Sequence, residues 1–296
     1  MRGVTLFLLS LSFLAPSANA EMHEPEGYLL APPCKSYHRP SRQELSRVRI
    51  LFSKILRGIT DQNAMRSQWN ALGFDWLPAE LDGESIVVLK EHASRCEGRG
   101  LFMIRTASGP LNLLQIPHRF HDKKTGNIGY ALMWHGDFRI AAFNTIPRYA
   151  RNKDGDGKAA DLVRNGDNYF TALAEAAVLL SADSRVIQIH GFDSAKRNSD
   201  PGRNSQVIIS DGTRHPSGNV QALVRCLASD FDEQVGLYPR DVDELGATTN
   251  QIGSILRKYD HQGFMHIELS SDARHALLSD CALMTKMAVC LSGRRH

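Results

Sequence analysis

Apolar and polar positions repeat with two different periods along the chain. Over 45–56 the apolar residues recur at helical spacing, and Ser41 with Glu44 forms a capping-box pattern, which predicts a helix that begins at Ser41. A second stretch, over 64–76, mixes apolar and polar residues and ends near Pro78. Both stretches precede the region where strand-like runs begin.

Short apolar runs alternate with longer amphipathic stretches over the rest of the chain. The runs predict strands at 86–89, 100–105, 111–116, 140–143, 186–189, 207–209 and 264–269. The stretches predict helices at 167–182, 219–229, 249–259 and 272–291. This alternation is typical of an α/β fold, so we expect a three-layer sandwich around a mostly parallel or mixed central sheet. In such a sheet the ligand crevice lies beyond the carboxyl ends of the strands.

The N-terminal segment has the organisation of an export signal. Arg2 supplies a positive charge, residues 4–14 are mostly apolar, and Ala18 and Ala20 give a small-x-small cleavage pattern. We therefore expect a periplasmic or secreted protein. The expected organisation is a cleaved signal peptide over 1–20, a helical and irregular extension over 21–80 and an α/β domain over 81–296.

Charge and cysteine content narrow the partners and the compartment. A formal net charge of +3, with no basic stretch interleaved with aromatic residues, argues against a nucleic-acid partner. No other segment approaches ~18 uninterrupted apolar residues, so we expect no stable membrane insertion after signal cleavage. The chain has five cysteines, an odd number, so at least one lacks an intramolecular partner. Cys281 with Cys290, or Cys34 with Cys96, are candidate pairs.

Three predicted strands end in side chains that are able to bind a metal or carry a proton. His118, His121 and Asp122 follow the first, His190 ends the second, and Glu268 lies in the last. A catalytic zinc site uses three N or O ligands and leaves one position for water. We therefore expect Zn2+ to be held by His118, His190 and a second ligand from the first loop. Asp122 is preferred to His121, because two imidazoles with one carboxylate form a common hydrolytic set.

Glu268 is the candidate general base. In the last strand, residues 264, 266, 268 and 270 share one face, and the apolar Met265, Ile267 and Leu269 share the other. A glutamate between apolar neighbours in a central strand is costly to bury without a partner. Glu268 therefore either belongs to a functional site, which would account for its burial, or lies on an edge strand that faces the solvent, where no such cost arises.

The chain resembles the zinc-dependent N-formylglutamate amidohydrolase group and, more broadly, the zinc carboxypeptidase-like hydrolases. The resemblance extends over 111–274, a little over half of the chain. Its motifs are Pro117-His118 after one apolar strand, His190-Gly191 after a second, and Ile267-Glu268-Leu269-Ser270 near the C-terminus.

The resemblance implies roles for particular residues. It makes His118, Asp122 and His190 the zinc ligands and Glu268 the general base. The chain departs from the usual His-x-x-Glu pair, because the spacing is longer and the acid is Asp122. Substrates of this group carry a carboxylate that a fixed arginine has to hold. Three arginines follow the predicted strand ends and are candidates for this clamp: Arg148, Arg197 and Arg274.

These expectations define one function and one alternative. The first is an exported zinc-dependent amidohydrolase or peptidase that cleaves an amide in an N-acyl amino acid or small peptide, such as cell-wall or γ-glutamyl material. The alternative is a secreted, non-catalytic ligand-binding protein on a hydrolase-like scaffold.

Two other signals are weaker. Residues 152–157 match the first half of a calcium loop, but its last position is Val163 and not the required glutamate. Ser210 with His215 suggests a nucleophile pair, but the sequence offers no third group to orient it.

Overall fold

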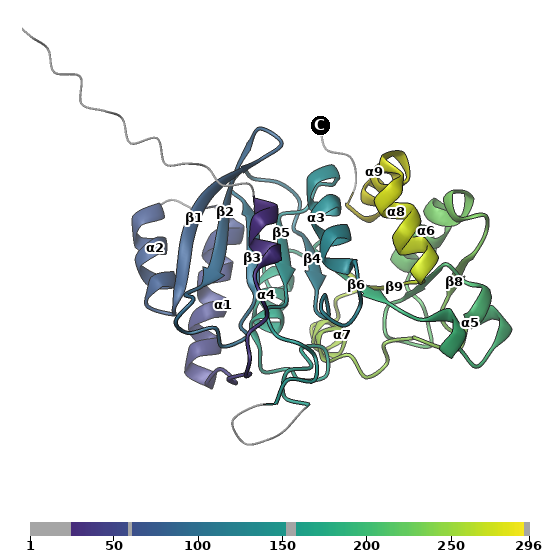
Figure 1. The fold of residues 1–296 in the computed structure, drawn as a ribbon, viewed down its shortest axis with the longest axis horizontal. Coiled ribbons are helices and arrows are strands. Elements are labelled where there is room, and N and C mark those ends of the chain that lie inside the picture. Colours follow the sequence, from purple (N-terminus) through teal and green to yellow (C-terminus); the bar gives the residue numbers. More distant parts are fainter. Residues whose placement is uncertain (1–24, 59–60, 152–157, 293–296) are drawn as a thin grey trace, which may run out of the picture.

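The chain folds around one mixed sheet, which the computed structural model shows for residues 25–58, 61–151 and 158–292 (Figure 1). The strand order is β1-β2-β3-β5-β4-β6-β9-β7-β8. The strands are β1 (Phe74–Leu81), β2 (Glu84–Glu91), β3 (Leu101–Arg105), β4 (Asn112–Ile116), β5 (Ile140–Phe143), β6 (Arg185–Gly191), β7 (Val207–Ser210), β8 (Val235–Leu237) and β9 (Phe264–Leu269).

The centre of the sheet is parallel and its flanks are not. β5, β4, β6 and β9 pair in parallel, whereas β1, β2 and β3 form an antiparallel meander that joins β5. On the other side β7 runs antiparallel to β9, and β8 runs parallel to β7. The four central strands therefore bring their carboxyl ends to one edge of the sheet.

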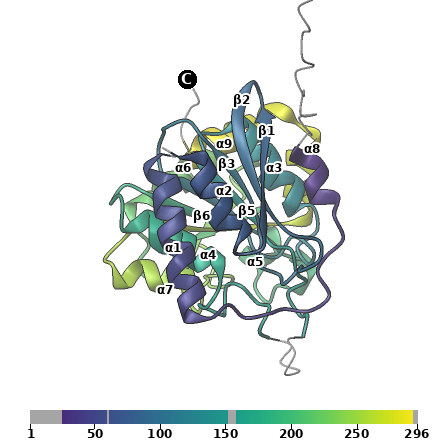
Figure 2. The ribbon, with the colours of Figure 1, turned by 90° about the vertical axis from the view of Figure 1, so that its left-hand side faces the viewer.

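Helices cover both faces, as Figure 2 shows in a side view. They are α1 (Arg42–Arg57), α2 (Gln62–Asn70), α3 (Thr125–His135), α4 (Tyr169–Val178), α5 (Asp200–Asn204), α6 (Gly218–Leu227), α7 (Gln251–Lys258), α8 (Ser271–Ser279) and α9 (Cys281–Ser292). Short 3-10 turns lie at Pro25–Leu30, Ser194–Lys196 and Ala228–Phe231. α1, α2, α4 and α7 pack in one apolar cluster, and α3, α6, α8 and α9 pack in another.

The two clusters confirm the expected three-layer sandwich. Neighbouring residues of a strand point to opposite layers, so Val186 lies in the first cluster and Ile187 in the second. Every residue of β9 is buried, because helices cover it on both sides. The strands predicted at 140–143 and 264–269 have the bounds of β5 and β9.

Several elements differ from the sequence prediction. Pro78 does not end an element but lies inside β1, an edge strand with only β2 beside it, where the missing N–H breaks no ladder. The helix predicted over 272–291 is two helices, because Asp280 is extended and its carboxylate accepts the N–H groups of Ala282 and Leu283. The sequence did not predict α3, α5, β1 or β8.

Helix α3 escaped prediction because it contains two glycines, which are poor helix formers. Gly129 has a packing role. A Cβ atom there would lie 3.0 Å from the ring of Phe143 and nearer still to Ile116. The glycine therefore lets α3 approach β4 and β5 closely, which fixes the loop between β4 and α3.

Two disulfides support this framework. Cys34–Cys96 joins the N-terminal segment to the loop after β2, as one of the two candidate pairs predicted. Cys226–Cys290 joins α6 to α9, so the pairing of Cys281 with Cys290 was wrong. Both of those residues lie in α9, nine residues and about 13 Å apart, beyond the reach of a disulfide. Cys281 is a free, exposed thiol.

Some predictions fall outside the described residues. They include the signal peptide over 1–20 and the calcium-like segment at 152–157. The division between an extension over 21–80 and a domain over 81–296 stays a prediction. Within the described ranges, no helix combines the length and the apolar character that a bilayer crossing needs.

The close approach of α3 can be tested by substitution. Gly129→Val forces β-branched bulk against Ile116 and Phe143, and we expect the free energy of unfolding to fall by about 1–3 kcal/mol in urea denaturation. Gly218→Ala is the matched control, because no atom lies within 4 Å of the added methyl group. Equal stability of the two variants would contradict the proposed packing role.

Candidate metal centre

The candidate centre is assembled by the loop after β4 and the end of β6. A tight turn follows His118, whose carbonyl accepts the N–H groups of His121 and Asp122 at 2.8 Å each. The turn reverses the chain direction within four residues, so that the Asp122 side chain lies beside that of His118. Because β4 and β6 are parallel neighbours, His190 at the end of β6 reaches the same point.

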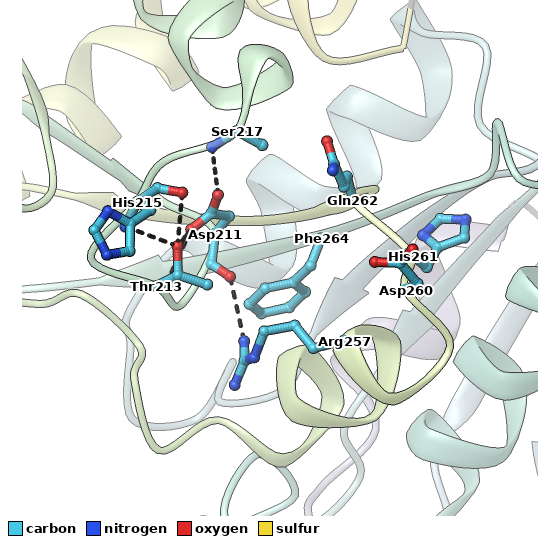
Figure 3. Close-up of a pocket in the computed structure, with 9 residues that line it drawn as sticks. All are labelled: Asp211, Thr213, His215, Ser217, Arg257, Asp260, His261, Gln262 and Phe264. Atoms are coloured by element: carbon cyan, nitrogen blue, oxygen red, sulfur yellow. Dashed lines mark hydrogen bonds between the residues drawn. The ribbon is translucent and has the colours of Figure 1, made fainter.

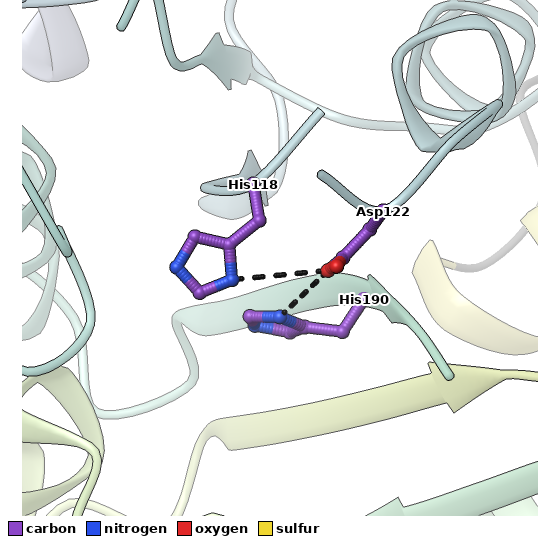
Figure 4. A group of neighbouring side chains, drawn as sticks. All are labelled: His118, Asp122 and His190. Atoms are coloured by element: carbon purple, nitrogen blue, oxygen red, sulfur yellow. Dashed lines mark ion pairs between the residues drawn. The ribbon is translucent and has the colours of Figure 1, made fainter. Parts of the chain in front are cut away.

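His118, Asp122 and His190 converge in the interior (Figure 4). One ligand atom of each lies within 4.8 Å of those of the other two. Asp122 Oδ2 lies 3.4 Å from His190 Nδ1 and 3.7 Å from His118 Nδ1. Ligands that surround a tetrahedral zinc ion at 2.0–2.2 Å are roughly 3.3–3.6 Å apart, so these separations suit such an ion.

An unused nitrogen atom supports the fit. His118 Nδ1, the atom that faces Asp122, is buried and has no hydrogen-bond partner among the described residues. The other ring nitrogen of His118, Nε2, lies 3.1 Å from Asp161 Oδ1. Metal-bound histidines characteristically donate their second N–H to a carboxylate, which leaves the opposite nitrogen free for the metal. The donor set of two imidazoles and one carboxylate is one that zinc accepts.

The carboxylates of Asp122 and Asp161 are both held in the ionised form. Burial alone would raise the pKa of Asp122, but the hydrogen bond and charge of His190 and the charge of His118 hold it below the usual value. Burial opposes ionisation of Asp161 too, yet His118 and Arg148 lower its pKa to about 2. A metal ion would therefore meet carboxylates that need no deprotonation.

Arg148 has a different place from the one predicted for it. Its Nε donates to Asp161 Oδ2 at 3.0 Å, and its Nη2 lies 2.9 Å from the same oxygen. The guanidinium thus orients Asp161, which in turn orients His118. Asp161 was missed in the sequence, because it lies in an irregular segment between β5 and α4 with no strand or motif to mark it.

His121 lies away from the cluster. It is exposed, and its ring packs edge-on against Tyr149 with 5.3 Å between the centroids. The structure therefore places Asp122, and not His121, beside His118 and His190.

Glu268 lies on the strand next to His190. The two residues are direct partners in the parallel register of β6 and β9, and both are buried. Glu268 Oε1 lies 3.2 Å from His266 Nε2, and the ring of His266 is centred 4.5 Å from that of His190. Burial, with a contribution from His190, lowers the pKa of His266, although Glu268 opposes the change. His266 thus joins the candidate ligand to the candidate base.

The remaining two arginines are already engaged. Arg274, in α8, donates to the carbonyl groups of Phe192 and Leu269. Burial lowers the pKa of Arg274, while the negative charges of Asp122 and Glu268 raise it. Arg197 pairs with Glu244 at 3.6 Å.

A separate cavity of about 370 Å³ lies near the other end of β9 (Figure 3). Asp211 in its wall accepts hydrogen bonds from Thr213 and from the N–H of Ser217, so its carboxylate is satisfied. Ser210 donates to the carbonyl of Gly246 at 2.7 Å and makes no hydrogen bond with His215 among the described residues. The candidate pair of Ser210 and His215 is therefore not formed in the part of the chain that the structure describes.

Comparisons with known proteins found similar chains among solved structures. No protein-family model matches the chain, and no curated protein matches it. N-formylglutamate amidohydrolase from Ralstonia eutropha JMP134 is 14% identical, with a TM-score of 0.46. The matched region covers 65% of this chain and 97% of the amidohydrolase chain. Csd4 of Helicobacter pylori, a D,L-carboxypeptidase, is 13% identical, with a TM-score of 0.36. The matched region covers 62% of this chain and 51% of the Csd4 chain.

A bacteriophage poly-gamma-glutamate hydrolase is 11% identical with a TM-score of 0.35, covering 62% of this chain and 82% of its own. The group that the sequence motifs resemble is therefore represented among these solved structures.

The role of Asp161 generates a prediction about metal affinity. Asp161→Asn keeps the size of the side chain but removes the charge that polarises His118, so zinc affinity should fall about 10- to 100-fold. Competition against a chromophoric zinc chelator measures the change. Asp200→Asn is the matched control, an exposed carboxylate paired with Arg203. Unchanged affinity in the Asp161 variant would leave that residue a purely structural ion-pair partner.

Proposed function

We propose that the chain is a zinc-dependent hydrolase of amide bonds in N-acyl amino acids or small peptides, with His118, Asp122 and His190 as the ligands. The supporting observation is the buried histidine–aspartate–histidine cluster, with Asp161 behind one histidine and Glu268 beside the other. The cluster lies at the carboxyl edge of the parallel strands, where α/β proteins bind ligands.

Zinc would supply a Lewis acid that makes water nucleophilic near neutral pH and polarises the amide carbonyl. The protein's own residues complete the reaction. Glu268 accepts a proton from the attacking water and transfers it to the nitrogen of the leaving amine. One carboxylate serves both steps because a single proton moves from nucleophile to leaving group.

His266 positions Glu268 for this transfer. The contact between His266 Nε2 and Glu268 Oε1 fixes one carboxylate oxygen, and we assign the proton transfer to the other oxygen. Because His266 is almost fully buried and packs against His190, its ring cannot swing away from this position without disturbing a ligand. The geometry of the base is thereby tied to the geometry of the metal ligands.

The substrate carboxylate has one favoured partner among the three arginines predicted. Arg274 donates to the carbonyls of Phe192 and Leu269, which closely follow His190 and Glu268 in the chain, so its charge lies near the reacting groups. Arg148 holds Asp161 and Arg197 holds Glu244, so each would have to leave a carboxylate in order to bind another. Arg274 is therefore the arginine we assign to the substrate.

Export fits the covalent structure. Disulfides persist in oxidising compartments and are rare in reducing ones. Cys34–Cys96 and Cys226–Cys290 each join segments more than sixty residues apart, with separations of 62 and 64. We therefore propose a periplasmic or secreted enzyme whose residues 1–20 are removed as a signal peptide.

The proposed base can be tested directly. Glu268→Gln should lower kcat by about 10²- to 10⁴-fold on a panel of N-acyl amino acids and dipeptides, while the zinc content stays at that of the parent. Chelation should abolish hydrolysis and added zinc should restore it. His275→Gln, an exposed change in α8, is the matched control. Bound zinc without hydrolysis, and no effect of Glu268→Gln on ligand binding, would favour the non-catalytic alternative.

Positioning by His266 predicts a different kinetic signature. His266→Ala should lower kcat by about 10- to 100-fold with little change in KM, because the base is present but misplaced. His266→Gln retains an N–H donor and should recover most of the loss. If both variants lose zinc as well as activity, His266 supports the metal ligands and does not position the base.

A further inference from the structure

A second cavity, which we call the basic pocket, opens between the N-terminal segment and the edge of the sheet. Its volume is about 530 Å³. Four cationic side chains line it, together with one carboxylate and an apolar wall that includes Tyr28, Pro32 and Pro33. The cations are Lys35, Lys90, Arg95 and Arg119, and the carboxylate is Glu91.

Glu91 has little capacity to satisfy these cations. Its oxygens accept the N–H of Glu97 at 2.8 Å, the N–H of Arg99 at 3.0 Å and the hydroxyl of Thr145 at 2.7 Å. The side chain is buried, and these contacts hold together the loop that follows β2. The carboxylate is thus a structural group, and the positive charge of the pocket remains in excess.

Arg119 is the most informative of the cations. Its Nε donates to the carbonyl of Asn144 at 2.7 Å and its Nη1 to the carbonyl of Leu29 at 2.6 Å. It forms no ion pair among the described residues, and its side chain is partly buried. A guanidinium withdrawn from water without a carboxylate partner is unfavourable, and a bound anion would relieve that cost.

The other cations leave charge available as well. Lys35 is exposed and forms no ion pair among the described residues, and Lys90 lies 5.7 Å from the ring of Tyr28. Asp75, opposite Lys90 in the strand register, pairs with His92 at 3.4 Å. Arg95 is the exception, because it pairs with a glutamate beside the pocket.

The pocket lies at the same edge of the sheet as the metal centre. Arg119 follows His118 directly, so their Cα atoms are about 3.8 Å apart. Leu101, another lining residue, pairs in register with Phe143 at the carboxyl end of β5. The pocket and the centre therefore border adjacent residues of the chain at the carboxyl edge of the central strands.

We propose that the basic pocket binds a carboxylate-rich chain, the part of the substrate remote from the amide that is cut, and so selects acidic acyl groups or acidic peptides. The role as a substrate subsite rests on the proposed function. Carboxylates fit because the guanidinium fork recognises them in two-point contact. The aromatic and proline wall suits the methylene groups of a peptide better than it suits a small hydrated anion.

Binding tests the pocket without any need for catalysis. Fluorescently labelled tetra-glutamate and tetra-glutamine peptides are titrated with the full protein, both as purified and after zinc removal, and anisotropy is measured. We expect tetra-glutamate to bind and tetra-glutamine not to bind, and the affinity for tetra-glutamate should fall as the ionic strength rises. Arg119→Gln should weaken it about 10- to 100-fold, and Lys35→Gln with Lys90→Gln about 2- to 5-fold. Arg225→Gln, an exposed arginine in α6, is the matched control.

The outcomes separate this proposal from the proposed function. Equal affinity for the two peptides, binding to neither, or binding that the lysine double variant leaves unchanged would overturn the pocket assignment. If Arg119→Gln proves unstable, the double variant of Lys35 and Lys90 still tests the pocket, because neither lysine is buried. Selective binding of tetra-glutamate, with no hydrolysis of any amide by the zinc-loaded protein, would support the pocket and refute the hydrolase.

Discussion

The burial of the Asp122 carboxylate between two imidazoles is the contact on which the rest of the site depends. Asp122 is only 6% exposed, so water cannot stabilise its charge. Burial by itself disfavours ionisation, and His190 and His118 more than reverse that effect. In the proposed centre, a metal cation shared by the same three side chains would stabilise this charge further. The local structure, from the turn at 118–122 to the register of β6 with β9, keeps these groups together.

That contact is part of a longer polar chain through an apolar interior. It begins at Arg148 and Asp161, passes through the three candidate ligands, and continues through His266 to Glu268. Cationic or imidazole groups separate the carboxylates along it, so no two carboxylates lie in direct contact. This order explains why Arg148 lies behind a ligand: a buried Asp161 orients His118 only if its own charge is balanced.

Sequence periodicity predicted much of this arrangement, because the buried parallel strands are continuous apolar runs with polar side chains at their ends. His118, His190 and Glu268 were found in that way, and the strand ends were correctly expected to share an edge. Other features depend on contacts that no local pattern encodes. Asp161 comes from an irregular segment, α3 is obscured by glycines that packing requires, and the Cys226–Cys290 bridge joins helices that are distant in sequence.

The N-terminal segment has a place in the site as well as in the framework. The carbonyl of Leu29 binds Arg119, and Cys34 is tied by its disulfide to the loop that Glu91 organises. Tyr28 and the two prolines after it complete the wall of the basic pocket. The candidate metal centre is built from residues that follow β4. In our proposals, amide chemistry belongs to the central strands, whereas the choice of acyl chain or peptide belongs to the wall that the N-terminal segment forms.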